Sequence, residues 1–164
     1  MTRTILIATD YSLESLNILK KVMREKETSE DKDQYNILLV SGYDTGDSIR
    51  DLLFNTKSTI FNKLRPQEFC EAYGIIKNKY PHLIHRIICD IFTGSFQRTF
   101  NNYVKAENIE EAYYSPTIKS KGDGKFDLIP YIKKCKDLKS HEVSVEIQER
   151  LPEKGRLAEI FAEA

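Results

Sequence analysis

The sequence predicts an α/β domain: an open, doubly wound, mostly parallel sheet of five strands with helices on both faces, followed by a C-terminal tail helix. Two observations predict this class. Short apolar runs alternate along the chain with amphipathic segments of helical period, the order typical of βαβ units. At 164 residues, 40% of them hydrophobic and 30% charged, the chain has the size and composition of one globular domain. We place this domain at residues 1–150 and the helical tail at 151–164.

The first strand is predicted at residues 5–9 and the first helix at 13–25, joined by a turn of Asp10, Tyr11 and Ser12. In the simplest interpretation, Asp10 or Ser12 caps the helix by accepting hydrogen bonds from its free N–H groups. In an open parallel sheet, however, ligands bind outside the carboxyl ends of the strands. The same turn is therefore also a candidate ligand site, and both interpretations stay open.

The remaining elements are justified by apolar patterning and turn residues. The stretch 35–41 is apolar almost throughout, as in a strand covered on both faces. Phe96, Phe100, Tyr103 and Val104 form one apolar stripe at helical spacing, which predicts a helix that packs on the sheet. In order, we expect a polar loop at 26–34, a strand at 35–41, a helix beginning at Asp47 or Ser48, a helix at 67–79, a strand at 83–92, the striped helix, a short strand around 112–114, a helix capped by Asp127, a strand at 141–148 and a tail helix at 153–164.

The predicted last strand, His141 to Gln148, alternates apolar and polar residues. Val143, Val145 and Ile147 point to one face, the pattern of an edge or interface strand. Alternatively, these three side chains pack on a core helix of the same chain, and the tail helix covers the edge.

The charge balance and hydropathy narrow the function classes. Lys and Arg (25) equal Asp and Glu (25), so the chain has no overall field that attracts nucleic acid or an anionic membrane. It has no apolar run near the ~20 residues of a membrane span and no secretory leader pattern. We therefore expect a cytoplasmic protein that binds neither nucleic acid nor membrane.

Motifs for metal binding, disulfides and catalysis are absent from the sequence. The cysteines are odd in number and widely spaced, and the histidines lack the spacing of a helical metal pair: Cys70, Cys89, Cys135, His82, His85 and His141. No nucleophile–base arrangement can be argued from spacing, and Glu110 and Glu111 fall on opposite faces of one strand. We therefore predict no metal site, no catalytic residue and a chain that is not an enzyme.

The order of strands and helices, and above all the segment Ala8-Thr9-Asp10-Tyr11-Ser12, resembles the universal stress proteins of the adenine nucleotide α-hydrolase-like group. The resemblance covers roughly residues 3 to 148, and the first strand with its turn is its distinctive part. It implies contacts to the nucleoside at Ala8, Thr9 and Asp10, with Ser41 in the place of a usual apolar contact. The candidate ligand residues on this side are Ala8, Thr9, Asp10, Ser12 and Ser41.

The phosphate side departs from the family pattern. ATP-binding members carry a loop G-x2-G-x9-G followed by Ser or Thr, whose glycines let backbone N–H groups approach the phosphates. Here that loop would begin at Ser115, and only Gly124 matches its last glycine, with Lys125 in place of Ser or Thr. The sequence therefore argues against tight ATP binding.

Two interpretations of the substitute loop remain. Its lysines and glycines can form a replacement anion site, or the loop can be an ordinary solvated connection. The residues concerned are Lys119, Lys121, Gly122, Gly124 and Lys125.

Taken with the resemblance, the sequence predicts a non-enzymatic, universal-stress-protein-like module. We expect it to act as a homodimer through the strand at 141–148, since the final strand commonly meets its two-fold mate in the resembling family. Candidate ligands are an adenine nucleotide, such as ATP or AMP, or another small anion. The alternatives are a nucleotide-dependent enzyme of the same group, adenylating or thiol-handling, and an interaction domain whose ligand site has decayed.

Overall fold

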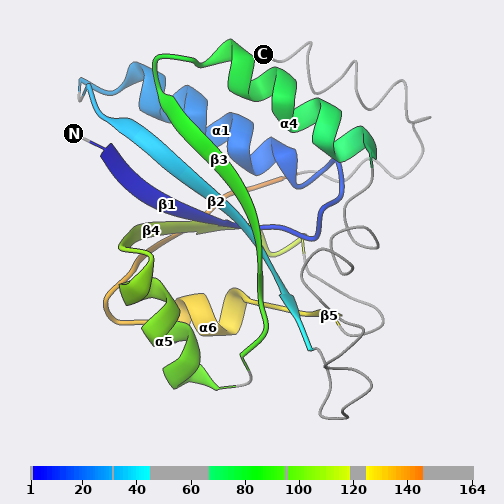
Figure 1. The fold of residues 1–164 in the computed structure, drawn as a ribbon, viewed down its shortest axis with the longest axis vertical. Helices are drawn as coiled ribbons and strands as arrows, with labels where there is room; N and C mark the ends of the chain where they lie inside the picture. Colours follow the sequence, from blue (N-terminus) through cyan, green and yellow to red (C-terminus); the bar gives the residue numbers. More distant parts are fainter. Residues whose placement is uncertain (1, 31, 45–66, 95, 119–124, 146–164) are drawn as a thin grey trace.

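The computed structural model describes residues 2–30, 32–44, 67–94, 96–118 and 125–145. Strands and helices alternate along most of this chain (Figure 1). In order they are β1 (Thr2–Ala8), α1 (Leu16–Thr28), β2 (Gln34–Tyr43), α4 (Gln67–Lys79), β3 (Ile84–Phe92), α5 (Gln97–Ala106), β4 (Ile109–Tyr114), β5 (Lys125–Phe126), α6 (Ile129–Lys134) and β6 (Lys139–Glu142).

The strands form one six-stranded sheet in the order β3-β2-β1-β4-β6, with β5 paired to β2 off this path. All neighbours along the path are parallel, and only β5 is antiparallel. The predicted open, mostly parallel α/β sheet is confirmed. The unpredicted β5 raises the number of strands from the five expected to six among the described residues. Because β2 lies on one side of β1 and β4 on the other, the chain order reverses between β1 and β4. The carboxyl ends of these two strands therefore flank the topological switch point, where ligands bind in folds of this type.

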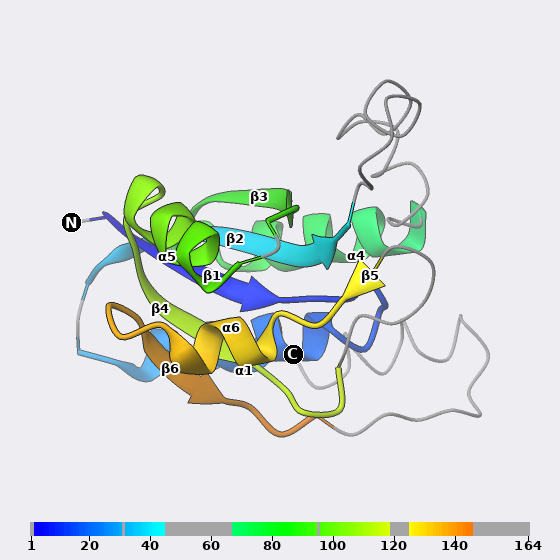
Figure 2. The same ribbon diagram turned by 90° about the horizontal axis from the view of Figure 1, so that it is seen from below.

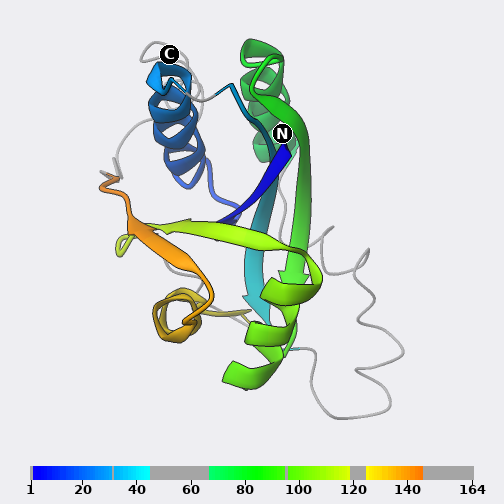
Figure 3. The ribbon, with the colours of Figure 1, turned by 90° about the vertical axis from the view of Figure 1, so that its left-hand side faces the viewer.

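Helices cover both faces of the sheet: α1 and α4 lie on one face, and α5 and α6 on the other (Figure 3). Successive residues of β1 point to opposite faces of the sheet and so belong to two different cores. Ile5 and Ile7 belong to the core under α1 and α4, whereas Leu6 and Ala8 belong to the core under α5 and α6. This double burial explains why the central strands are apolar without alternation.

The start of α1 differs from the prediction. The helix begins at Leu16 and not at 13, and its N-cap residue, Ser15, makes no side-chain capping hydrogen bond. Residues 12–15 instead form a turn, in which the Ser15 hydroxyl donates to the Ser12 carbonyl at 2.7 Å. The interpretation of Asp10 or Ser12 as the cap of α1 is therefore wrong. At the other end α1 continues to Thr28, which shortens the loop expected at 26–34.

The last strand is also displaced from its predicted position. β6 covers Lys139–Glu142, so residues 143–145 of the predicted 141–148 strand lie outside any strand, and 146–148 lie outside the described residues. After Glu142 the chain turns toward its own core: Val143 is partly buried and Val145 is 4% exposed in the core under α1. For these two valines the alternative interpretation, packing within the same chain, is correct.

The predictions for α4 and α5 hold with one exception. Helix α4 has the predicted bounds, and Phe100 and Val104 of α5 are buried. Phe96 was expected in the same apolar stripe but is 73% exposed, because it precedes the helix in an extended conformation. The helices expected from Asp47 or Ser48 and at 153–164 lie outside the described residues.

Before α6, Asp127 accepts a hydrogen bond from the Ile129 N–H at 3.1 Å, although the N-cap position itself is Leu128. In the part of the chain that the structure describes, no helix has the length and hydropathy needed to cross a bilayer.

Candidate functional site

The turn after β1 is built from side-chain hydrogen bonds, beginning with Thr9. The Thr9 N–H donates to the Val40 carbonyl at 3.0 Å, which extends the contact between β1 and β2 by one residue. The Thr9 hydroxyl accepts from the Tyr11 N–H at 2.9 Å and lies 2.7 Å from the Ser15 hydroxyl. Since Thr9 is only 4% exposed, its hydroxyl stabilises the turn and faces inward.

Tyr11 anchors the turn to the sheet. Its backbone has a φ of 59°, in the left-handed region that non-glycine residues rarely adopt. Its buried ring packs edge-to-face on Phe69 of α4, with centroids 5.2 Å apart. The hydroxyl donates to the carbonyls of Leu39 (3.0 Å) and Asp90 (2.6 Å), on β2 and β3. These contacts across two strands hold the unusual backbone conformation in place.

Asp10 is half-buried and uses only one of its carboxylate oxygens in the turn. Oδ1 accepts from the Ser12 N–H at 2.9 Å and from the Ser12 hydroxyl, an arrangement typical of an Asx turn. Oδ2 has no hydrogen-bond partner among the described residues. The turn therefore orients a carboxylate at the end of β1 and leaves one oxygen available to a donor. The Ser12 hydroxyl is already engaged within the turn, since it donates to Asp10 and also accepts from the Ser15 N–H at 3.3 Å.

The chain after β4 forms the other side of the switch point. Ser115 is 1% exposed, and its hydroxyl lies 3.0 Å from the hydroxyl of Thr117. Thr117 in turn donates to the Val145 carbonyl at 2.9 Å, and the Ile118 N–H donates to the Ser115 carbonyl at 3.1 Å. These hydroxyls join the chain after β4 to the chain after β6.

The carboxyl end of β2 is covered by β5, which the sequence did not predict. β1 ends opposite Val40, whereas β2 continues to Tyr43 and pairs there with Lys125 and Phe126. Figure 2 shows β5 at the end of the sheet toward which β1 and β2 point. Lys125, one of the residues of the substitute loop for which an anion site and a solvated connection were both open, lies in β5, opposite Tyr43. The other residues expected in that loop lie outside the described residues: Lys119, Lys121, Gly122 and Gly124.

The structure thus brings the predicted nucleoside-side residues together but covers several of them. Ala8, Thr9 and Ser41 are 6%, 4% and 1% exposed, whereas Asp10 and Ser12 are half-buried. Sequence reasoning missed Phe126 and Tyr11 as parts of this site. The β5 pairing gives no local signal, because its partner lies more than eighty positions away.

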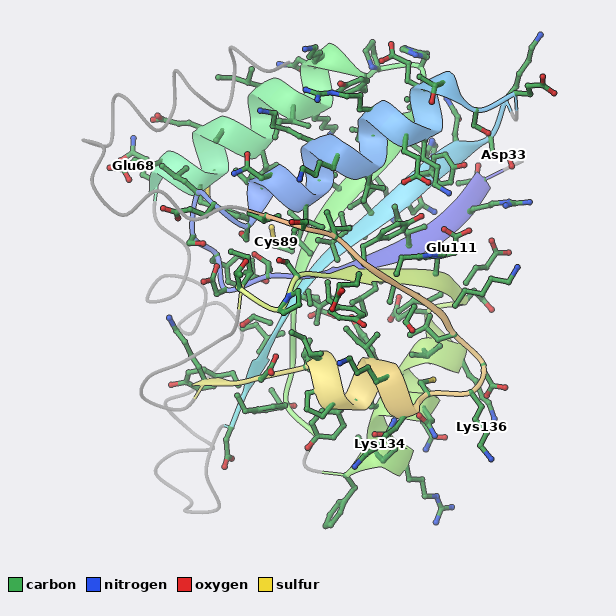
Figure 4. The ribbon with its side chains drawn as sticks, turned by 180° about the vertical axis from the view of Figure 1, so that it is seen from behind. Asp33, Glu68, Cys89, Glu111, Lys134 and Lys136 are labelled. Atoms are coloured by element: carbon green, nitrogen blue, oxygen red, sulfur yellow. The ribbon has the colours of Figure 1, made fainter. Side chains whose placement is uncertain are left out.

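A second polar cluster lies on the α1 face, toward the β6 edge. Glu111 accepts from the Tyr113 hydroxyl at 2.6 Å and from the Lys26 ammonium at 3.2 Å, and the His141 ring nitrogen lies 3.9 Å away. Burial alone would raise the pKa of Glu111, but these hydrogen bonds outweigh it and hold the pKa below its ordinary value. Figure 4 shows Glu111 at the same end of the sheet as Asp33, the residue before β2, which is the end where the strands begin.

This Glu111 cluster does not resemble a metal site. Within the described ranges, no group of three or more His, Cys, Asp or Glu side chains could hold a metal ion. The three cysteines form no disulfide, and burial raises the pKa of Cys135.

The fold and the turn at its switch point define the class: an open, doubly wound α/β domain of the kind that binds small ligands at the carboxyl ends of its strands. Among solved structures, the universal stress protein UspA from Lactobacillus plantarum superimposes with a TM-score of 0.54 at 10% identity, over 87% of this chain and 97% of that one. This chain has the universal stress protein fold, so the resemblance expected from the sequence is confirmed at the level of the fold.

Two further solved structures match with lower scores. The hypothetical protein PH0823 has a TM-score of 0.46 at 14% identity, over 91% of this chain and 99% of that one. A universal stress protein in complex with cAMP has a TM-score of 0.47 at 9% identity, over 88% of this chain and 98% of that one. No protein-family model and no curated protein matches the sequence.

Proposed function

We propose that this chain is a non-enzymatic, universal-stress-protein-like module of the cytoplasm. It binds an adenine nucleotide or another small anionic ligand at the turn after β1, and it acts through dimerisation. The observation that carries the proposal is the carboxylate of Asp10, fixed through Oδ1 while Oδ2 has no partner among the described residues.

The chemistry of this oxygen suits a hydroxylated ligand. A carboxylate accepts hydrogen bonds from the two adjacent hydroxyls of a ribose, as acidic residues do in other doubly wound folds. The hydroxyls nearest in the turn, those of Thr9, Ser12 and Ser15, hydrogen-bond to one another or to the backbone of the turn. They support the carboxylate: the Ser12 hydroxyl donates to Asp10 Oδ1 and fixes its orientation toward a ligand.

Two variants of Asp10 test the proposal. Asp10→Asn keeps an oxygen that accepts from Ser12 but replaces the second oxygen by a donor, whereas Asp10→Ala removes both. A ligand at about 100 times its dissociation constant stabilises the wild type by about 2.7 kcal/mol. We expect both variants to lose this ATP-, AMP- or adenosine-induced thermal shift, measured with and without magnesium. Without ligand, Asp10→Ala should be about 0.5–2 kcal/mol less stable and Asp10→Asn close to wild type, by analogy with a lost cap. Equal ligand-induced thermal shifts in all three proteins would contradict the proposal.

A specific observation favours a second candidate, an interaction domain whose ligand site has decayed. Ala8, Thr9 and Ser41 are buried by the protein itself, with β5 paired beside them. If calorimetry detects no binding of adenine nucleotides at millimolar concentration, this second candidate is preferred.

The proposed dimer is supported by the position of β6. This strand is last in the sheet order, and all four of its residues are exposed. An edge strand presents N–H and C=O groups to a second chain. Light scattering on the full chain should give the mass of two chains. A single-chain mass both for the full chain and for a version truncated after Gln148 would rule out pairing through this edge.

A further inference from the structure

The strand β5 occupies the edge of β2 that the end of β1 leaves free. One side of Gly42 pairs with Phe92 of β3, and the other pairs with Phe126 of β5. On this same edge of β2, Val40, two residues before Gly42, pairs with Ala8, the last residue of β1. β5 therefore lies where β1 would continue if it were longer, directly outside the carboxyl end at which the proposed ligand binds.

Two features of the structure hold β5 in this place. Gly42 has no side chain, and a Cβ there would lie 2.6 Å from the Phe126 carbonyl oxygen and 2.7 Å from its ring, too close for any real contact. The Phe126 ring also packs against aromatic side chains of two other elements, with centroids 6.2 Å from Phe92 and 5.8 Å from Tyr131. The backbone pairing and the ring contacts both depend on the close approach that Gly42 permits.

The contacts of β5 divide the proposed site into two parts. On the β2 side, Ala8 and Ser41 are 6% and 1% exposed, and Phe126 packs against the core to which Ala8 belongs. On the other side, Asp10 is half-buried and keeps one oxygen without a partner among the described residues. A ligand can reach Asp10 directly, but contact with the free edge of β2 at Gly42 and Tyr43 requires that β5 moves.

We infer that β5 is a built-in competitor of the ligand and that Phe126 sets how tightly a planar base binds at this site. The inference rests on the proposed function. In the closed state, the main chain of Gly42 and Tyr43 hydrogen-bonds β5, and a nucleoside takes that place only when β5 has separated from β2. The apparent affinity for the nucleoside is then reduced by the fraction of molecules in which β5 is open.

Two variants that release β5 by opposite means test this inference. Phe126→Ala removes the ring that packs on Phe92, and Gly42→Ala keeps the ring but adds a methyl group that collides with β5. Phe96→Ala is the matched control, since this phenylalanine is 73% exposed. Adenosine and ATP are titrated by calorimetry into the wild type and the three variants, and hydrogen–deuterium exchange is followed at residues 125–126. We expect both β5 variants to exchange faster there. Phe126→Ala, which adds no atoms at the site, should also bind adenosine about tenfold more tightly, with the control unchanged.

The outcomes separate this inference from the proposed function. If the wild type binds adenosine as tightly as Phe126→Ala does, the inference is overturned and the proposed function stands. If none of the four proteins binds adenosine or ATP, the proposed ligand is wrong and the inference falls with it. The wild type provides a test that needs no variant: saturating ATP should accelerate exchange at residues 125–126. Unchanged slow exchange in the complex would show that β5 and the ligand do not compete.

Discussion

The two faces of the sheet carry side-chain clusters of opposite chemistry. On the α5 and α6 face, Phe92 contacts four aromatic rings at centroid distances of 5.3 to 6.2 Å: those of Phe100, Tyr103, Tyr131 and Phe126. On the α1 face, Glu111 lies among Lys26, Tyr113 and His141, and the Lys26 ammonium lies over the ring of Tyr35 at 5.3 Å.

The difference between the two clusters lies in what holds them together. The aromatic cluster depends on buried apolar area and ring geometry, which do not change with pH. The Glu111 cluster depends on the charge of one carboxylate, near an edge strand that is exposed. The aromatic cluster includes Phe126 of β5 and so borders the proposed ligand site. We therefore expect the closure of the site to be insensitive to pH and the β6 edge to be sensitive to acid.

The largest effect is expected from a substitution at the centre of the aromatic cluster. Phe92 is 4% exposed, and Phe92→Ala leaves a cavity between four rings. Substitutions of this kind cost about 3–5 kcal/mol in the free energy of unfolding. Urea denaturation measures the loss, and Phe96→Ala, an exposed phenylalanine, should stay within about 0.5 kcal/mol of wild type. Equal losses in the two variants would mean that the rings do not form a core.

A smaller effect is expected from the polar cluster. Glu111→Gln keeps the shape of the side chain but leaves the Lys26 ammonium, 14% exposed, without its counter-charge. Loss of a charged hydrogen-bond partner in such a site costs about 1–3 kcal/mol. Glu110→Gln is the matched control on the neighbouring position, because the Glu110 side chain is 50% exposed and its contact with Arg3 is 3.8 Å long. The same denaturation experiment should find that control close to wild type.

The pH dependence of this cluster has a definite sign. Because the pKa of Glu111 in the folded protein is held below its ordinary value of 4.5, the unfolded chain binds the proton more readily. The stabilisation from Glu111 is therefore fully present above the ordinary pKa and is lost as the pH falls through the folded-state pKa. Measured from neutral pH down to about pH 3, the difference in unfolding free energy between wild type and Glu111→Gln should shrink. A constant difference would contradict the assignment of Glu111 as the ionised centre.

The smallest effect concerns the polar rim of the aromatic cluster. The Tyr103 hydroxyl donates to Asp90 Oδ2 at 2.8 Å, and burial together with the neighbouring Asp90 charge raises the pKa of Tyr103. Tyr103→Phe keeps the ring and removes only this hydrogen bond, which contributes about 0.5–1.5 kcal/mol. Thermal unfolding at neutral pH measures the change. A loss as large as that of Phe92→Ala would show that the hydroxyl, and not the ring, organises this face.

The prediction of the fold succeeded where local pattern and burial agree. β2 is buried on both faces, so its residues are apolar without alternation and were recognisable as a central strand. The pattern failed at Phe96 and at Val143 and Val145. There, the helical or alternating spacing continues beyond the point at which the backbone leaves the helix or strand.

The candidate site was only partly predictable from the sequence. By itself the sequence determined the α/β class, the parallel direction of its main strands and the position of Asp10 after β1, because these follow from apolar runs and from residues adjacent in the chain. Only the tertiary structure decided that Thr9 faces inward and that Tyr11 is held by carbonyls of two other strands. It also decided that β5 covers the end of β2, a pairing that requires Gly42 and Phe126 to meet across a long stretch of chain. Contacts of this kind depend on which distant segments of the backbone come together in space. The periodicity of residues along the sequence carries no information about such contacts.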